Sequence, residues 1–111
     1  MNRRFGVRRA TVLSNGRTAG HLLANGRRFV FLYDKAYLAS GGPSIAIGLP
    51  KSRRVFSSRF LFPYFSGLLP EGENRKFVCG RLGLDPDDGF GLLTALAGRE
   101  TIGNVVVRRA R

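Results

Sequence analysis

The residues that could support catalysis or metal binding are few and lie far apart in this chain. His21 is the single histidine and Cys79 the single cysteine, so the chain lacks a ligand set for zinc. His21 stands beside leucines in a strand-like segment, which predicts a packed or edge histidine. Cys79 follows Phe77-Val78 in a helix-like segment, which predicts a buried, inert thiol.

The acidic residues fit helix capping better than chemistry. Asp85-Pro86-Asp87-Asp88-Gly89 opens like a calcium loop, but the twelfth position is Leu96 where a bidentate glutamate is required. Glu71 and Glu73 suit the first turn of a helix, where the dipole favours negative charge. The chain also lacks a phosphate-binding G-x-x-x-x-G-K-[ST] motif. We therefore expect no catalytic residue, no metal and no cofactor, and predict that the protein is not an enzyme.

The stretch best suited to binding a partner is basic and aromatic. Lys51 to Ser58 has little core patterning and is expected to be a loop, and five large apolar residues follow within six positions: Phe60, Leu61, Phe62, Tyr64 and Phe65. This is more bulk than one short connection needs. We expect some of these side chains to remain exposed, as aromatic anchors of an interface are.

Each residue of this stretch has an expected place. Phe65, Leu68 and Leu69 should fill the core, while the arginines could meet carboxylates of a partner. The predicted partner-binding residues are Arg53, Arg54, Arg59, Phe60, Phe62 and Tyr64. An alternative stays open, in which all the aromatic side chains are core and all the arginines are solvated.

The net charge of +12 favours acidic partners such as nucleic acid, an acidic protein or a membrane face. Sixteen of the nineteen basic residues are arginine, and many come as doublets such as Arg8-Arg9 and Arg108-Arg109. Neighbours on a strand point to opposite faces, so a doublet does not by itself form a stripe. A generally solvated basic surface and a functional basic patch both remain open, and a nucleic-acid-binding module is the alternative that the charge supports.

The length of 111 residues suits one domain, spanning residues 1–111. No apolar run follows the basic start of the chain as in a secretion signal, and none could span a bilayer. A single cysteine cannot form an internal disulfide. These features lead us to expect a cytoplasmic protein.

Strands and tight turns are predicted for the first half. Asn15-Gly16 and Asn25-Gly26, both strong hairpin signals, separate three strand-like segments at Phe5–Leu13, Thr18–Ala24 and Arg28–Tyr33. This pattern predicts an antiparallel meander. The aromatic residues of the third strand are expected in the core.

Two further elements are expected before Pro50. Asp34 is placed to cap a short helix through Tyr37-Leu38. Ile45, Ile47 and Leu49 alternate with small residues, which predicts a strand with one buried face.

Helices are predicted for the second half. One should begin with Pro70 at its first position and end at Gly83. Another should be capped by Asp85, with Pro86 at its first position, then Phe90, Leu93 and Ala97 at helical spacing, and an end at Gly98. Val105 to Val107 should form a last strand. The expected class is α+β: a small antiparallel sheet or partial barrel of about five to six strands, with two to three short helices in the C-terminal half.

A known family carries a similar series of motifs. The segment from Phe62 through Leu68-Leu69-Pro70-Glu71-Gly72 resembles the conserved block of the N-terminal domain of HipA-type toxin kinases, and the resemblance covers nearly the whole chain. The later matches are Arg75, Leu82-Gly83-Leu84, Asp88-x-Phe90-x-Leu92-Leu93 and Gly98-x-Glu100-x-x-Gly103. Two positions depart mildly, since the family usually has an aspartate at Glu100 and a small residue at Asn104.

The resemblance implies function by binding. HipA proteins continue into a kinase body with an ATP-binding loop and a catalytic aspartate, whereas this sequence stops at Arg111. It is therefore expected to resemble the HipS-type antitoxin of split, three-gene HipBST-type systems. Its implied partners are a HipA/HipT-like kinase toxin lacking this domain, bound near the active cleft, and a HipB-like helix-turn-helix protein in the same complex. Direct nucleic-acid contact is expected to be secondary, and no membrane partner is expected. A fragment of a longer HipA-type kinase remains an alternative.

Overall fold

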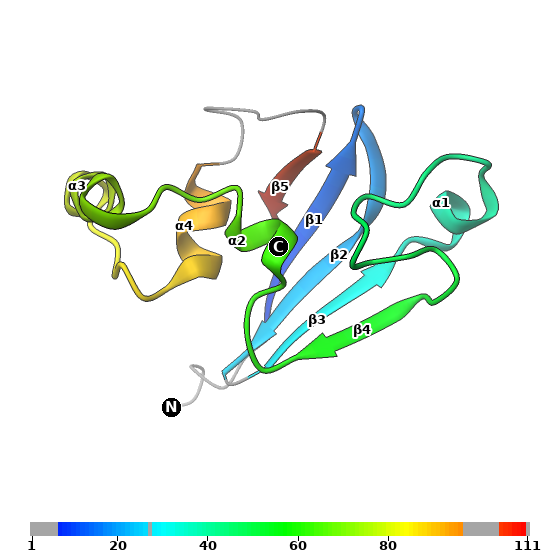
Figure 1. Cartoon of the computed structure of the whole chain (residues 1–111), viewed down its shortest axis with the longest axis horizontal. Helices are drawn as coiled ribbons and strands as arrows, with labels where there is room; N and C mark the ends of the chain where they lie inside the picture. Colours follow the sequence, from blue (N-terminus) through cyan, green and yellow to red (C-terminus); the bar gives the residue numbers. More distant parts are fainter. Residues whose placement is uncertain (1–6, 27, 97–104, 111) are drawn as a thin grey trace.

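A five-stranded antiparallel sheet lies at the centre of the computed structural model, which describes residues 7–26, 28–96 and 105–110 (Figure 1). The strands lie in the order β4-β3-β2-β1-β5. Their bounds are Arg8–Ser14 for β1, Arg17–Asn25 for β2, Arg28–Tyr33 for β3, Val55–Ser58 for β4 and Val105–Arg109 for β5. The sheet is open, with β4 and β5 at its edges.

The meander predicted from the Asn-Gly pairs is confirmed. Asn15 and Gly16 both have positive φ, 53° and 77°, as a two-residue hairpin turn of the favoured type requires. Gly26 has a φ of 55° between β2 and β3. The second and third predicted strands form as expected, as β2 and β3, and β3 is an interior strand paired on both sides. The first forms as β1 from Arg8, while its predicted start at Phe5 lies outside the described residues.

Helix α1 (Lys35–Ala39) begins where it was predicted to begin. The Asp34 carboxylate accepts hydrogen bonds from the backbone N–H groups of Ala36 and Tyr37, at 3.1 and 3.3 Å. These bonds satisfy donors that have no partner within the helix.

The strand predicted at residues 45–49 is wrong. That segment forms bends and turns, the Ile47 side chain is fully exposed, and only Leu49 is buried. The Tyr33 hydroxyl accepts a hydrogen bond from Ile45 N at 3.1 Å and donates one to the Leu49 carbonyl. It thus pairs with backbone groups that a neighbouring strand would otherwise bind.

The edge position beside β3 belongs instead to β4, within the stretch expected to be a loop. Phe56 lies opposite Phe31 in the β3–β4 pair and is buried. Val55 and Ser57 point to the other side and are exposed. One buried side chain in four residues is too short a pattern to indicate a strand.

The described part of the C-terminal half forms three helices: α2 (Pro63–Ser66), α3 (Gly72–Leu82) and α4 (Gly89–Ala95). The short α2 was not predicted, and α3 begins at Gly72 rather than Pro70. Gly83 ends α3 in the left-handed conformation, with a φ of 70°, as predicted.

Asp88, and not Asp85, caps α4. The Asp88 carboxylate accepts a hydrogen bond from Gly91 N at 3.0 Å, whereas that of Asp85 accepts one from Asp87 N at 2.9 Å in a preceding turn. Phe90 and Leu93 are buried as predicted. The expected end of this helix, at Ala97 and Gly98, lies outside the described residues.

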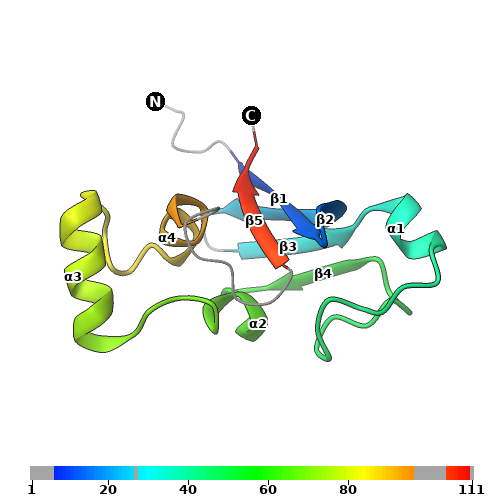
Figure 2. The same cartoon turned by 90° about the horizontal axis from the view of Figure 1, so that it is seen from above.

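One face of the sheet forms the core. Figure 2 shows α2 on one side of the sheet, and the buried Phe65 of α2 packs there against Phe31 of β3, with 5.8 Å between the ring centres. The largest fully buried side chains are Tyr33, Phe31, Phe65, Leu22, Leu92, Val12 and Cys79. The buried Cys79, the core positions of Phe31 and Tyr33 and the overall α+β class, with its five strands and short C-terminal helices, are therefore as predicted.

Candidate partner-binding site

The predicted basic and aromatic stretch is divided by β4 into two separate clusters. Arg53 and Arg54 come just before β4, whereas Arg59 and Phe60 come just after it. Four strand residues span about 13 Å, so the two ends are well separated. The structure therefore does not gather the six predicted residues into one patch.

The cluster before β4 is bound to the sheet. The Arg54 guanidinium donates a hydrogen bond from Nε to the Tyr33 carbonyl, at 3.0 Å. The Arg53 guanidinium lies 5.0 Å from the centre of the Phe56 ring and also donates to the Val55 carbonyl, at 3.3 Å. Both side chains thus have structural partners already, although both residues remain exposed.

The cluster after β4 is open to a partner. Phe60 is 77% exposed, which is high for a large aromatic residue. Its backbone N–H donates to the Ser58 hydroxyl at 3.1 Å, which holds the turn after the strand. The ring of Phe60 is therefore presented on a fixed backbone, with the exposed Arg59 beside it.

Phe60 borders a hollow of about 230 Å³. Its wall combines apolar side chains with two arginines and one acid; it is lined by Phe29, Arg59, Phe60, Leu61, Ser66, Leu69, Arg75, Asp87 and Gly89. A lining of apolar side chains with a few charged groups suits a protein segment that carries one apolar side chain and a nearby acid.

Arg75 was named from the sequence only as part of a motif, yet it lines this hollow. Its Nε donates a hydrogen bond to the Pro86 carbonyl at 2.7 Å, which ties α3 to the segment before α4. A Cβ at Gly89 would lie 3.3 Å from the Leu61 side chain and 3.7 Å from the Arg75 guanidinium, so a larger residue there would require the end of the Leu61 side chain to move by a few tenths of an ångström. The only signal in the sequence was the position of Arg75 three residues after the Leu-Leu-Pro-Glu-Gly block, as in the family motif.

The other two aromatic residues predicted to bind a partner, Phe62 and Tyr64, are buried or half-buried. Phe62 is only 8% exposed and packs edge-on against Phe65, so its prediction as an exposed anchor is wrong. Tyr64 is half-buried, and burial raises the pKa of its phenol above the usual value. Phe65 and Leu69 are buried as predicted, and Leu68 packs partly against the core.

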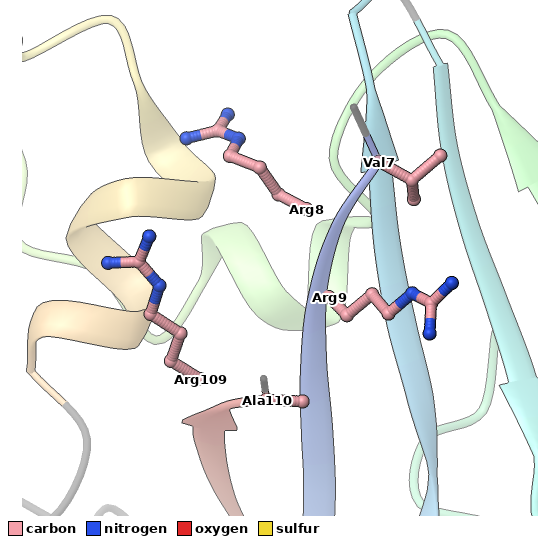
Figure 3. A pocket seen from close by; sticks show the side chains of 5 residues that line it. All are labelled: Val7, Arg8, Arg9, Arg109 and Ala110. Atoms are coloured by element: carbon pink, nitrogen blue, oxygen red, sulfur yellow. The ribbon is translucent and has the colours of Figure 1, made fainter. Parts of the chain in front are cut away.

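A second hollow lies at the other edge of the sheet. It has a volume of about 350 Å³ and is lined by Val7, Arg8, Arg9, Arg109 and Ala110. Figure 3 shows the guanidinium groups of Arg8 and Arg109 extending toward α4, while that of Arg9 points away. The two arginine doublets are thus split between the faces of the sheet, and cross-strand pairing brings one member of each to the same side.

In the described part of the chain, no three His, Cys, Asp or Glu side chains come together as a metal site. Nor does any helix within residues 7–26, 28–96 and 105–110 have the length and apolar character needed to cross a bilayer.

A comparison with known protein families supports the resemblance found from the sequence motifs. The sequence profile of the HipA N-terminal domain matches residues 10–108, nearly the full length. The chain belongs to the HipA N-terminal domain family. A solved structure of the N-terminal domain of HipA toxin superimposes with a TM-score of 0.72 at 28% identity, covering 100% of this chain and 98% of that one.

Two relatives from Sinorhizobium fredii (strain NBRC 101917 / NGR234) bear names of kinases. The protein named Putative kinase Y4mE is 34% identical over 94 residues, which is 83% of this chain and 22% of that protein. Putative kinase Y4dM is 33% identical over 87 residues, 72% of this chain and 21% of that protein. This HipA N-terminal domain thus spans about a fifth of the length of these relatives.

The Leu-Leu-Pro-Glu-Gly block of this HipA N-terminal domain connects α2 to α3. Leu69, its second residue, is buried, Glu71 is the residue before the first turn of α3, and Gly72 has a φ of 58°, which favours glycine. The block therefore sets the direction of α3 and the position of Arg75. The closing motif with Gly98, Glu100, Gly103 and Asn104 lies outside the described residues.

Proposed function

We propose that this chain is an antitoxin-type binding protein that neutralises a HipA-like serine/threonine kinase toxin lacking this domain. The observation that carries the proposal is the exposed Phe60 ring at the rim of a hollow with Arg59 and Arg75, within a HipA N-terminal domain. In this proposal the protein acts by binding and has no catalytic role. A HipB-like helix-turn-helix protein would share the complex.

Phe60 would provide most of the binding energy. An aromatic anchor that fills a partner's pocket contributes about 2–4 kcal/mol. The turn at Ser58 already holds the backbone of Phe60, so little backbone entropy is lost when the ring is buried.

Arg59 would direct the anchor to the kinase cleft. Kinases use carboxylates to hold the magnesium ions that bind the nucleotide phosphates, and a guanidinium pairs with a carboxylate through two hydrogen bonds. Arg59 is exposed beside Phe60, so both side chains could enter the same cleft. Occupation of these carboxylates would exclude the metal-bound nucleotide.

Co-expression with a HipA-like kinase that lacks this domain tests the role. We expect the chain to relieve the growth arrest and to co-purify with the kinase. Continued arrest without co-purification would exclude the antitoxin role. Phe77→Ala is a matched control for Phe60→Ala, because Phe77 is also exposed, at 63%, but lies on α3 away from the hollow.

A second candidate is the same domain acting inside a longer kinase. The match to about a fifth of Y4mE and Y4dM favours it. In that case the Phe60 hollow would contact the kinase body of the same polypeptide. The reading frame that adjoins this sequence distinguishes the two, since an in-frame kinase body favours the second candidate.

Nucleic-acid binding is the alternative that the net charge of +12 supports. It predicts an affinity for DNA or RNA that falls steeply with salt, because phosphate contacts release counterions. Absence of binding near physiological salt would exclude it.

A further inference from the structure

The face of the sheet opposite the core has no covering layer in the described part of the chain. In Figure 2, α2 lies on one side of the sheet and no described helix lies on the other. The side chains of the uncovered face, here called the open face, alternate with the core residues along every strand. All of those in described positions remain partly or fully exposed.

The centre of the open face is apolar. Leu23 of β2 lies opposite Val30 of β3, and Leu32 of β3 lies opposite Val55 of β4. Val55 is 50% exposed, and the other three are partly exposed. Adjacent apolar side chains on three strands form a continuous patch, which on a protein surface indicates an interaction site.

Arginines surround this apolar centre. Arg9 lies opposite Leu23, Arg108 lies opposite Thr11 on the same face, and Arg28 stands at the start of β3, where it donates to the Ser57 hydroxyl at 3.1 Å. Figure 3 shows that Arg9 points away from α4, toward this face. None of the residues in β1–β5 is Asp or Glu. The described strands therefore give the open face a mainly apolar centre, flanked by His21 of β2 opposite Leu32, and their only formal charges on this face are positive.

This chemistry selects the kind of occupant. Aliphatic side chains neither stack on bases nor pair with phosphates, so nucleic acid would leave the apolar centre unused. A second copy of the chain would place arginines against arginines across a two-fold axis. A protein surface with apolar side chains surrounded by carboxylates satisfies both parts of the face.

We propose that the open face is a second surface through which this domain docks on the kinase body, while the Phe60 hollow, on the other side of the sheet, remains available to the kinase cleft. The choice of a kinase body as occupant rests on the proposed function. It is supported by the relatives, in which about four fifths of each polypeptide lies outside the match. The domain would thus dock by one side of the sheet and inhibit from the other.

Thiol footprinting of the complex between the full chain and a HipA-like kinase lacking this domain tests the proposal. Leu23→Cys and Val30→Cys each place a thiol on the open face, and Phe77→Cys places a control thiol on α3. The native Cys79 is buried, so its labelling by N-ethylmaleimide reports any variant that fails to fold. We expect labelling at positions 23 and 30 to slow at least tenfold in the complex, and labelling at position 77 to stay within twofold.

Each outcome has a distinct meaning. A complex in which the open-face thiols react as fast as in the free chain overturns the docking face, while rescue of growth would leave the antitoxin role standing. Protection of these thiols in a complex that does not relieve growth arrest supports the docking face and contradicts the antitoxin role. Absence of a complex overturns both.

The competing occupants are tested with the chain alone. Slower labelling at position 23 on addition of a 20-base-pair DNA duplex, or on raising the concentration of the chain, would assign the face to nucleic acid or to self-association and overturn the proposal. Charge reversal adds a matched comparison. Arg9→Glu with Arg108→Glu should weaken the complex at least tenfold, whereas Lys76→Glu with Arg81→Glu, the same charge change on α3, should leave it within twofold. Equal losses would mean that net charge, and not this face, drives binding, which contradicts the proposal.

Discussion

Arg8 at the start of β1 and Asp88 at the cap of α4 form a two-bond ion pair across 80 positions of sequence. The two guanidinium nitrogens of Arg8 donate to the two carboxylate oxygens of Asp88, at 2.9 and 3.0 Å. The Arg8 guanidinium also lies 4.9 Å from the centre of the Phe90 ring. One carboxylate thus caps a helix and fastens that helix to the sheet.

Replacement of Asp88 should separate these two roles. Asp88→Ala removes the cap and the ion pair, and we expect it to lower the free energy of unfolding by about 1–2 kcal/mol. Asp88→Asn keeps a capping oxygen and should lose less, because partly exposed ion pairs contribute about 1 kcal/mol or less. Urea denaturation followed by circular dichroism measures both. An Asp88→Ala protein as stable as the original would contradict the capping role.

The same pair predicts a dependence of stability on pH. The hydrogen bond from Arg8 holds the pKa of the Asp88 carboxyl below its ordinary value of 3.8, burial opposes this, and the hydrogen bond from Gly91 N adds to the lowering. A pKa lowered by folding gives stability that is present above the ordinary pKa and is lost as pH falls through the folded value. The stability difference between the original protein and Asp88→Asn should therefore be constant above about pH 5 and shrink below about pH 4. A stability difference that stays the same from above pH 5 to below pH 4 would show that the ion pair does not contribute to the free energy of unfolding.

Gly20 of β2 should not tolerate a side chain. A Cβ there would lie 2.5 Å from the Leu32 carbonyl oxygen and 2.8 Å from the Phe31 ring. Since neither the backbone of β3 nor a fully buried ring can move easily, Gly20→Ala should cost about 1–3 kcal/mol of unfolding free energy. Gly48→Ala is the control, because no atom lies within 4 Å of a Cβ at that position. Equal thermal midpoints for the two variants would contradict this packing.

Phe60 and Phe62 should behave differently although only Leu61 separates them. Phe62 is buried against Phe65, so Phe62→Ala should cost about 3–5 kcal/mol of unfolding free energy. Phe60 is mostly exposed, so Phe60→Ala should change stability by less than about 0.5 kcal/mol. Denaturation midpoints of the two variants check this, and a large loss for Phe60→Ala would remove it as a candidate anchor.

The first half of the fold could be predicted because local signals decide it. Asn15-Gly16 fixes the first hairpin by its backbone preference, and Asp34 fixes the start of α1 by its side-chain hydrogen bonds. Neither depends on distant contacts, so a window of a few residues contains the information.

The sequence-based predictions were wrong where contacts with residues distant in the sequence decide the structure. Ile45 and Leu49 belong to an alternating pattern that is typical of a strand. In the structure, however, the Tyr33 hydroxyl forms hydrogen bonds with the backbone of both residues, and β4 occupies the sheet edge. Asp85 and Asp88 are equivalent as caps in sequence, and the ion pair with Arg8 favours Asp88. Phe60 and Phe62 stand two positions apart in the same aromatic segment, so the sequence does not show which of them is buried. The structure shows that Phe62 packs against Phe65.

The candidate site was predictable in part for the same reason. The sequence placed Arg59 and Phe60 together, since they are adjacent, but it could not place Phe29 or Arg75 beside them. These residues reach the hollow from β3 and α3. Whether Arg75 lies close to Phe29 depends on the direction of α3, which follows the Leu-Leu-Pro-Glu-Gly block.

The dissociation constant between this chain and a HipA-like kinase lacking this domain tests the central claim most directly. An anchor that contributes about 2–4 kcal/mol predicts that Phe60→Ala raises the constant about 30-fold to 1,000-fold. Phe77→Ala, the same change at an exposed phenylalanine on α3, should leave it within about twofold of the original value, as expected for a position outside the interface. Equal affinities for the original protein and Phe60→Ala would contradict the claim that Phe60 anchors the kinase.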